Sequence, residues 1–323
     1  MIVTPQPQVP ILTVTLNPAL DIATSAEKVV PDLKLRCAAP AFDAGGGGIN
    51  VSRAVALMGG QSTAVVALAG HNGMRMHDLL LAEPGVEVLR LEAPAETRQS
   101  ISVIDRSTGE QFRFVMPWPE WQAPQVRAVM DAVAAAASED GILVVSGSNP
   151  PGVPAGFPIL LAERLNGRGT CLFVDTSGEA LAAVASGRAG PIAVLRMDDA
   201  EAEDLAGRPL STRRDTADFA SSLVQGGAAR AVIVARGADG NIVANARGRW
   251  HAEAPPVEVV SKVGAGDSFV AGYALGIARG MAEPDALALG AAAAAATCMT
   301  PATDLCRPED VERLYAERVV SAV

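Results

Sequence analysis

The chain has few aromatic residues, few histidines and no cluster of basic residues. Only 4% of its 323 residues are aromatic and three are His, whereas 49% are hydrophobic. The core must therefore be aliphatic, as it is where helices pack on a parallel sheet. The formal net charge is −10, and the absence of a Lys/Arg cluster argues against nucleic acid or an anionic membrane as a partner.

The cysteines follow neither a metal-binding nor a disulfide pattern. Cys37, Cys171, Cys298 and Cys306 include no Cys-x-x-Cys pair and have no His at metal-ligand spacing, as is typical of reduced cytosolic thiols. The Ala-rich stretch 286–299 is too short to span a bilayer, and Glu283 and Asp285 stand just before it. We therefore predict a cytoplasmic protein with no membrane partner.

Strand and helix patterns alternate along most of the chain. Buried strands are expected at 11–16, 62–69, 141–146, 170–174, 192–195 and 230–235. Helices are expected at 73–82, 122–136, 154–166, 215–226, 269–278, 284–298 and 308–319. This rhythm predicts a single α/β domain over residues 1–323, with a doubly wound, mostly parallel sheet flanked by helices.

Alternating polar and apolar runs interrupt this rhythm at 33–42, 86–91, 97–105 and 110–116. Consecutive short strands of this kind predict a small inserted β-sheet. We expect it to form a lid from about 17–42 and 86–117. Because one face of such a sheet stays uncovered, we also expect a homodimer in which two lids pack together.

The strongest chemical signal is Val263-Gly264-Ala265-Gly266-Asp267-Ser268, which directly precedes an apolar helical run. Bare backbone amides at the start of a helix bind anions. A carboxylate at that position suits a base that takes a proton from a hydroxyl attacking phosphorus. The alternative is a glycine-rich turn in which Asp267 only caps the helix.

Other polar groups form candidates for an acceptor site. Asp21 follows the first strand, and four glycines (Gly45 to Gly48) enter a helix that carries Asn50 in its first turn. Lys34 and Arg36 share one face of the run 33–42. The alternatives are a turn-stabilising Asp21, a flexible glycine linker and solvated surface cations.

Five spaced motifs, in family order over nearly the whole chain, resemble those of the ribokinase-like sugar kinase family in its phosphofructokinase B branch. They are Thr15 to Asp21, Gly45 to Arg53, Thr97-Arg98-Gln99, Ser146 to Gly152, and Val263 to Ser268. Further stretches, such as Gly109 to Pro117, resemble the minor bacterial 6-phosphofructokinases within it. Relatives that act on fructose 1-phosphate or tagatose 6-phosphate commonly have Lys where this chain has Gly47.

The resemblance implies a role for each matching position. Asp267 is the implied catalytic base, with the amides of Gly264, Ala265 and Gly266 as its anion hole. The implied contacts to the sugar phosphate are Asp21, Gly46, Gly47 and Asn50 at the hydroxyls, with Lys34, Arg36, Arg98 and Ser148 around the phosphate. On the nucleotide side they are Arg196, Asp198, Ala235, Gly237 and Gly240, with Glu201 at a magnesium ion through water.

Two motifs depart from the family on the nucleotide side. The chain has Arg196-Met197-Asp198-Asp199-Ala200-Glu201 where the family usually has Lys-Pro-Asn-x-x-Glu. It also has Ala235 where a Ser or Thr usually precedes the glycine-rich turn.

The resemblance implies ATP- and Mg²⁺-dependent phosphorylation of a ketohexose phosphate, with fructose 6-phosphate as the expected substrate. The alternatives are a tagatose-6-phosphate or fructose-1-phosphate kinase, or a non-catalytic sugar-phosphate sensor.

Overall fold

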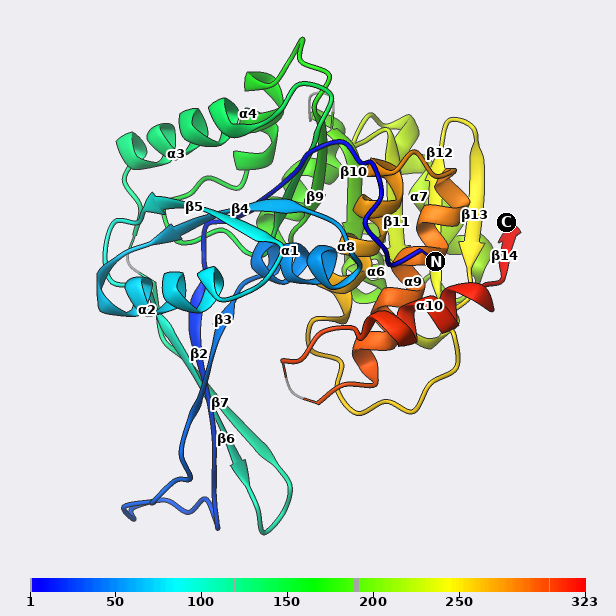
Figure 1. The fold of residues 1–323 in the computed structure, drawn as a ribbon. Helices are drawn as coiled ribbons and strands as arrows, with labels where there is room; N and C mark the ends of the chain where they lie inside the picture. The colour runs from blue at the N-terminus through cyan, green and yellow to red at the C-terminus, as the bar shows by residue number, and fades with distance from the viewer. Residues whose placement is uncertain (1, 119, 189–191, 302) are drawn as a thin grey trace.

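A computed structural model describes residues 2–118, 120–188, 192–301 and 303–323, and its centre is a ten-stranded sheet (Figure 1). The strand order is β14-β13-β12-β11-β10-β9-β8-β1-β4-β5, parallel from β11 to β5 and antiparallel from β12 to β14. The strands are β1 Ile11–Thr15, β4 Ser62–Leu68, β5 Val86–Glu92, β8 Ile142–Ser146, β9 Cys171–Asp175, β10 Ile192–Met197, β11 Ala231–Ala235, β12 Asn241–Asn245, β13 Gly248–Ala252 and β14 Val320–Ala322. The predicted doubly wound fold is confirmed.

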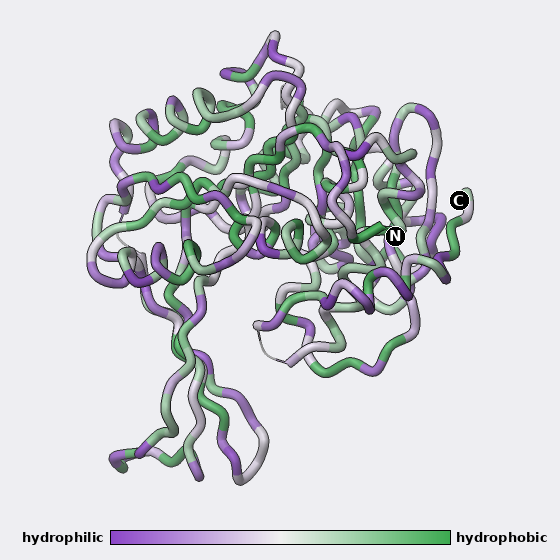
Figure 2. The backbone as a smooth tube through the Cα atoms, in the orientation of Figure 1, coloured by the Kyte–Doolittle hydropathy of each residue, from purple (hydrophilic) through white to green (hydrophobic). Residues whose placement is uncertain are grey.

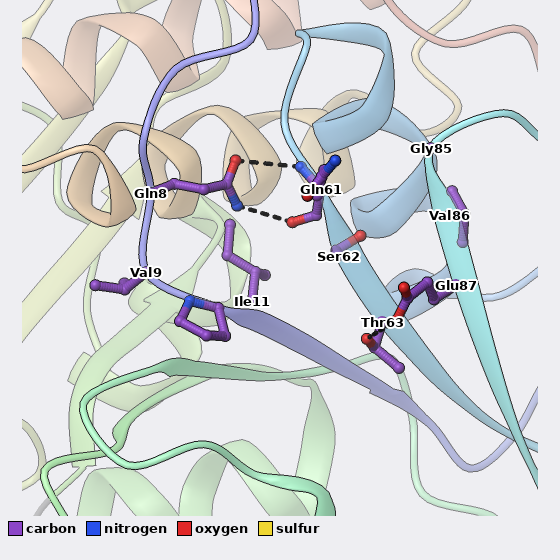
Figure 3. Close-up of a pocket in the computed structure, with 10 residues that line it drawn as sticks. Gln8, Val9, Ile11, Gln61, Ser62, Thr63, Gly85, Val86 and Glu87 are labelled. Atoms are coloured by element: carbon purple, nitrogen blue, oxygen red, sulfur yellow. Dashed lines mark hydrogen bonds between the residues drawn. The ribbon is translucent and has the colours of Figure 1, made fainter.

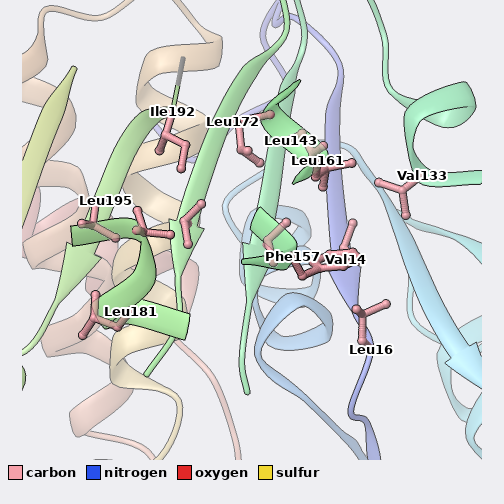
Figure 4. Close-up of a cluster of buried hydrophobic side chains, with 14 of the residues drawn as sticks. Val14, Leu16, Val133, Leu143, Phe157, Leu161, Leu172, Leu181, Ile192 and Leu195 are labelled. Carbon is pink, nitrogen blue, oxygen red and sulfur yellow. The ribbon is translucent and has the colours of Figure 1, made fainter. Parts of the chain in front are cut away.

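Helices cover both faces of this sheet. One face packs against α1 Gly47–Leu57, α8 Ala265–Ala278, α9 Glu283–Cys298 and α10 Pro308–Ala316. The other packs against α3 Ala123–Ala136, α4 Phe157–Arg164, α5 Gly178–Ala183, α6 Asp199–Ala206 and α7 Arg213–Gln225. Alternate residues of one strand serve the two layers, since Leu143 joins the α4 side (Figure 4) while Val144 joins the α8 side.

A second sheet, the small sheet, extends away from this domain as a twisted ribbon (Figure 1). Its order is β3-β2-β6-β7, with β2 Ala19–Ala26, β3 Ala41–Gly45, β6 Gln99–Asp105 and β7 Gln111–Val115. Helix α2, Gly70–Leu81, packs where this sheet joins the large one. Hydrophilic and hydrophobic stretches both run along it (Figure 2).

Side-chain alternation gives the small sheet two chemically different faces. Paired positions place Ile22, Ile101 and Phe114 on one face, and Asp21, Ser100 and Val115 on the other. The side chain of Phe114 is 50% exposed. The face with Phe114 is thus open in a single chain, whereas the other face carries Asp21 and Ser100 together with Val115, which is 60% exposed.

Three expectations about local structure are wrong. The run 86–91 is not part of the small sheet, because β5 pairs in parallel with β4 at the edge of the large sheet. Residues 33–40 are mostly irregular, with one isolated bridge at Cys37. Asp21 lies within strand β2 instead of a turn.

Candidate active site

Helix α8 starts at a position whose positive φ favours glycine. Gly264 is the N-cap with φ 75°, and Asp267 follows in the first turn. The side-chain amide of Asn50, on α1, donates to Asp267 Oδ2 at 2.8 Å. Burial raises the pKa of Asp267 to about 7, and the nearby negative charge of Asp175 adds to this effect. A carboxyl group with this pKa can accept a proton near neutral pH.

Three neighbouring strands end beside this carboxyl group. Ser146, Asp175 and Arg196 stand at matched positions of β8, β9 and β10. Ser146 Oγ donates to Asp175 Oδ2 at 3.2 Å and lies 3.5 Å from Asp267 Oδ1. The guanidinium of Arg196 donates to Asp175 Oδ1 at 3.1 Å. Chain topology therefore builds a buried polar cluster at the carboxyl edge of the sheet, where α/β proteins bind ligands.

Arg196 lies directly over the start of α8. A Cβ atom added at Gly266 would approach its guanidinium to 3.3 Å. Its Nε is buried and has no hydrogen-bond partner among the described residues. A buried donor left without a partner is costly, so this geometry suits an anionic group held between Arg196 and the α8 amides.

The sugar-side candidates on the small sheet and the glycine run meet at one small pocket. Asp21, Asp43, Asn50 and Gly264 line it. Burial raises the pKa of Asp21, against the lowering effects of Ser100, Arg113 and Arg98. Asp21 and Asn50 thus come together with the N-cap of α8.

The glycine run lies too close to other backbone for side chains. Gly46 has φ 148°, and a Cβ atom there would lie 2.6 Å from Thr15 Cγ2. A Cβ atom on Gly47 would lie 2.5 Å from Ser146 Oγ and 2.9 Å from the amide of Gly147. These contacts confirm that the run is a packed loop entering α1 and not a flexible linker.

The phosphate-side candidates separate into two groups. Arg98 Nε donates to Asn17 Oδ1 at 3.0 Å, and Asn17 in turn donates to Ser148 Oγ at 3.1 Å. Lys34 and Arg36, in contrast, are exposed in the segment between β2 and β3, at the end of the small sheet remote from the large domain (Figure 1). One chain alone does not bring these two cations to Asp267.

The nucleotide-side candidates are held by contacts within the protein. Asp198 caps α6: its side chain accepts from Glu201 N at 2.9 Å, and Glu201 Oε2 accepts from Asp198 N at 2.9 Å. Burial raises the pKa of Glu201. Ala235 ends β11, and the following turn uses Gly237 at φ 55° and Gly240 at φ 108°.

The side chain of Arg236 does not replace the hydroxyl missing at Ala235. It donates to Asp239 Oδ2 at 2.8 Å and to the carbonyl of Leu210 at 2.9 Å. Arg213 also donates to Asp239, and together these arginines lower the pKa of that carboxyl group to about 2. Arg236 is therefore a structural part of this turn.

Sequence reasoning did not identify Asp175 or Ser146 as site residues. Each ends a buried apolar strand, and that position was the available signal. No group of three His, Cys, Asp or Glu within the described ranges could hold a metal ion. Nor does any helix in those ranges have the length and apolarity needed to cross a membrane.

The opposite edge of the sheet carries a different, polar pocket. It lies between Gln8, Gln61 and Glu87, at the amino ends of β1, β4 and β5 (Figure 3). Gln8 and Gln61 bind one another at 2.8 and 3.1 Å. This pocket contains none of the predicted site residues.

The fold and the site together define a ribokinase-like α/β kinase. The chain belongs to the pfkB family of carbohydrate kinases, whose model matches residues 15–310. It is 37% identical to the ATP-dependent 6-phosphofructokinase isozyme 2 of Mycobacterium tuberculosis H37Rv over 94% of this chain and 88% of that one. The same isozyme of Escherichia coli K12 is 37% identical over 95% and 98%.

Solved structures show the same likeness. Phosphofructokinase-2 from E. coli in complex with substrates and products superposes with a TM-score of 0.87 at 37% identity, covering 96% of this chain and 99% of that one. The 1-phosphofructokinase of E. coli K12 is also similar, at 32% identity over 88% of this chain and 89% of that protein.

Proposed function

We propose that this chain transfers the γ-phosphoryl group of ATP to the 1-hydroxyl of fructose 6-phosphate. The observation that carries the proposal is Asp267 itself. Its carboxyl group has a pKa of about 7, lies at the start of α8 and accepts a hydrogen bond from Asn50, which lines the Asp21 pocket. The names of the 37% identical relatives support the choice of reaction.

The proposed step is a direct in-line transfer. Asp267 takes the proton of the attacking hydroxyl, the new O–P bond forms, and the bond to the β-phosphate oxygen breaks so that ADP leaves. The amides of Gly264, Ala265 and Gly266 stabilise charge on the moving group. Asn50, which donates to Asp267 at 2.8 Å, keeps the acceptor oxygen of that carboxylate in place.

The sugar-phosphate contacts are assigned by their positions. Asp21, Gly46, Gly47 and Asn50 border the small pocket or the loop beside it and would bind hydroxyls. Arg98 and Ser148, joined through Asn17, would bind the phosphate that the sugar already carries. Lys34 and Arg36 stay predicted clamp residues, and their remote position means that another copy of the chain would have to supply them.

The residues on the other side fit ATP with Mg²⁺. Arg196 has an unpartnered buried Nε for a phosphate oxygen, while the backbone of Ala235, Gly237 and Gly240 offers a surface for the nucleotide. Glu201 and Asp198 add oxygen atoms near Arg196. When bound, Mg²⁺ would neutralise charge on the phosphates, and phosphate and water oxygens would complete its ligands.

Gly47 favours fructose 6-phosphate over the related ketohexose phosphates. A lysine there would place its Cβ 2.5 Å from Ser146 Oγ. The turn after β8 would then have to shift, and that turn carries Ser148 of the proposed phosphate site. The second candidate, a non-catalytic sensor, is favoured by the hydroxyl missing at Ala235, but it gives no role to the raised pKa of Asp267.

A coupled assay with ATP-Mg²⁺ tests the proposal. Fructose 6-phosphate, fructose 1-phosphate and tagatose 6-phosphate are compared at equal concentration. The proposal requires the highest kcat/KM with fructose 6-phosphate. Turnover with none of the three, combined with measurable sugar-phosphate binding, would favour the sensor.

We also propose a homodimer formed by two small sheets. The open apolar face with Ile22, Ile101 and Phe114 supports it, because a single chain leaves Phe114 50% exposed. Sedimentation at micromolar concentration is expected to give a dimer, and Phe114→Ser to shift it toward monomer. A wild-type monomer throughout would contradict this assembly.

We expect the protein to act in the cytoplasm, where its four free thiols stay reduced.

A further inference from the structure

A further pocket lies at the sheet edge opposite to Asp267. It opens between the amino ends of β9 to β11, the β12–β13 turn and the α8–α9 connection, and its volume is about 650 Å³. This size is within the range of small-molecule sites. We call it the hairpin pocket, and Phe173, Arg230, Arg247, Trp250, Tyr273 and Met281 line its main parts.

Small side chains create this space. Ala193 and Ala231 face it from β10 and β11, and Ala246 and Ala282 border its opening. The indole of Trp250 and the rings of Phe173 and Tyr273 supply flat apolar walls, with those two rings 5.8 Å apart. The body of the pocket therefore suits a flat or branched apolar group.

The charges around the pocket favour an anion. Glu283, its one carboxylate in the described part of the chain, is only 8% exposed and accepts from Tyr273 Oη at 2.9 Å, from Arg247 at 3.2 Å and from Asn245. Arg230 is exposed, makes no ion pair within the described residues, and contacts Cys171 Sγ at 3.5 Å. Two arginines against one already paired carboxylate leave net positive charge, on a chain whose net charge is −10.

The pocket is separate from the proposed catalytic site. Phe173 and Tyr273 form a wall, and a much smaller cavity behind them reaches Asp175 and Arg196. Asp267 lies at the carboxyl ends of the same strands. A ligand in the hairpin pocket would thus not occupy the space of sugar phosphate or nucleotide.

We propose that the hairpin pocket binds a small amphipathic anion, namely a carboxylate with an aromatic or branched aliphatic body. The apolar part lies between Trp250 and the Phe173–Tyr273 pair. The carboxylate pairs with Arg230, whose planar guanidinium matches it in a bidentate manner. Arg247 adds a second, weaker contact because Glu283 already engages it.

Isothermal titration calorimetry with 2-naphthoate tests this site on the full chain without requiring catalysis. Wild type is expected to bind 2-naphthoate. Arg230→Gln should bind it at least about tenfold more weakly, and wild type should bind the neutral analogue 2-naphthalenemethanol more weakly by the same factor. Ala246→Leu, at an exposed position of the β12–β13 turn, should weaken binding by filling the opening. Arg90→Gln, which removes a cation from the remote strand β5, is the matched control and should bind like wild type.

In the presence of saturating ATP and fructose 6-phosphate, the affinity for 2-naphthoate should stay within about twofold of its value without them. Displacement of the probe by these compounds would place it in the catalytic site and overturn the proposal. Equal affinity of the acid and the neutral analogue, or no change in both Arg230→Gln and Ala246→Leu, would overturn it as well. Failure of the phosphofructokinase assay would not affect these results, so the two proposals are tested separately.

Discussion

The proposed acceptor and donor sides of the site differ in what surrounds their polar groups. On the acceptor side, Asp21 and Asn50 border a pocket, and the closest contacts involve bare glycine backbone. On the donor side, Asp198 and Glu201 bind one another's amides, and Arg236 binds Asp239. The proposed acceptor side therefore offers a pocket and bare backbone to a ligand, while most polar groups of the proposed donor side hold its own loops, with Arg196 Nε as the exception.

This difference explains what the departures from the family pattern do. Asp198 remains a good helix cap in the place of Asn, since both residue types satisfy the amide at N3. His251, fully buried, donates from Nε2 to the carbonyl of Asp239 at 2.6 Å and fixes the same glycine turn. Nucleotide affinity should then depend on Arg196 and on backbone amides more than on the changed side chains.

The largest expected effect is the loss of the base shared by both sides. Asp267→Asn should lower kcat by roughly two to four orders of magnitude, because the amide cannot accept the hydroxyl proton. Sugar-phosphate affinity should remain close to wild type. Steady-state kinetics and calorimetric binding check this, and a variant that keeps more than about a tenth of wild-type kcat would contradict the role.

On the acceptor side, Arg98→Gln should raise KM for fructose 6-phosphate by roughly 10- to 100-fold, since a charge-assisted contact to phosphate is lost. KM for ATP should change little. Arg106→Gln is the matched control on the small sheet, because Arg106 pairs with Glu27 at 3.0 Å and both are well exposed. Equal effects of the two variants would show a general charge effect instead of a phosphate contact.

Asp267 should also affect stability, in a pH-dependent way. Its pKa is raised from 3.8 to about 7 in the folded protein, so the folded state binds the proton more tightly than the unfolded one. The stability that this gives is complete below pH 3.8 and is lost as the pH rises through 7. Between pH 4 and pH 8, the free energy of unfolding of Asp267→Asn should therefore rise by roughly 2–4 kcal/mol relative to that of wild type. If denaturant unfolding gives the same difference in unfolding free energy between variant and wild type at both pH values, the pKa of Asp267 is not shifted.

On the donor side, Asp198→Asn tests metal use and should have the smallest effect. The helix cap is preserved, so turnover should persist, but the dependence of initial rate on free Mg²⁺ should become less steep. Asp199→Asn removes a neighbouring exposed charge that lies outside the capping box and serves as the control. Superimposable Mg²⁺ curves for wild type and Asp198→Asn would make Asp198 a structural cap only.

The sequence predicted this arrangement well where the signal is local. The glycine run before α1, the glycine-initiated start of α8 and most buried strands follow from spacing and residue type. The contact of Ser146, Asp175 and Arg196 depends on strand order, which no local pattern encodes. Strand β5 was misassigned because an edge strand with one exposed face alternates like a strand of the small sheet.

The capping box of α6 was readable in advance but was given a different meaning. Asp198 and Glu201 stand three residues apart before an apolar position, which is a known helix-start pattern. The direction of the Arg236 side chain, in contrast, depends on Asp239 and on the distant Leu210 carbonyl. Contacts of that kind need the folded structure.

The most direct test of the account is the pH dependence of kcat/KM for wild type and Asp267→Asn with fructose 6-phosphate. The account predicts that wild-type kcat/KM falls about tenfold per pH unit below an apparent pKa near 7 and is level above it. The residual activity of Asp267→Asn should lack this fall at low pH. The variant therefore distinguishes titration of Asp267 from titration of the substrates. A wild-type profile that is level from pH 5.5 to 8, or an identical limb in the variant, would contradict the assignment of Asp267 as the base.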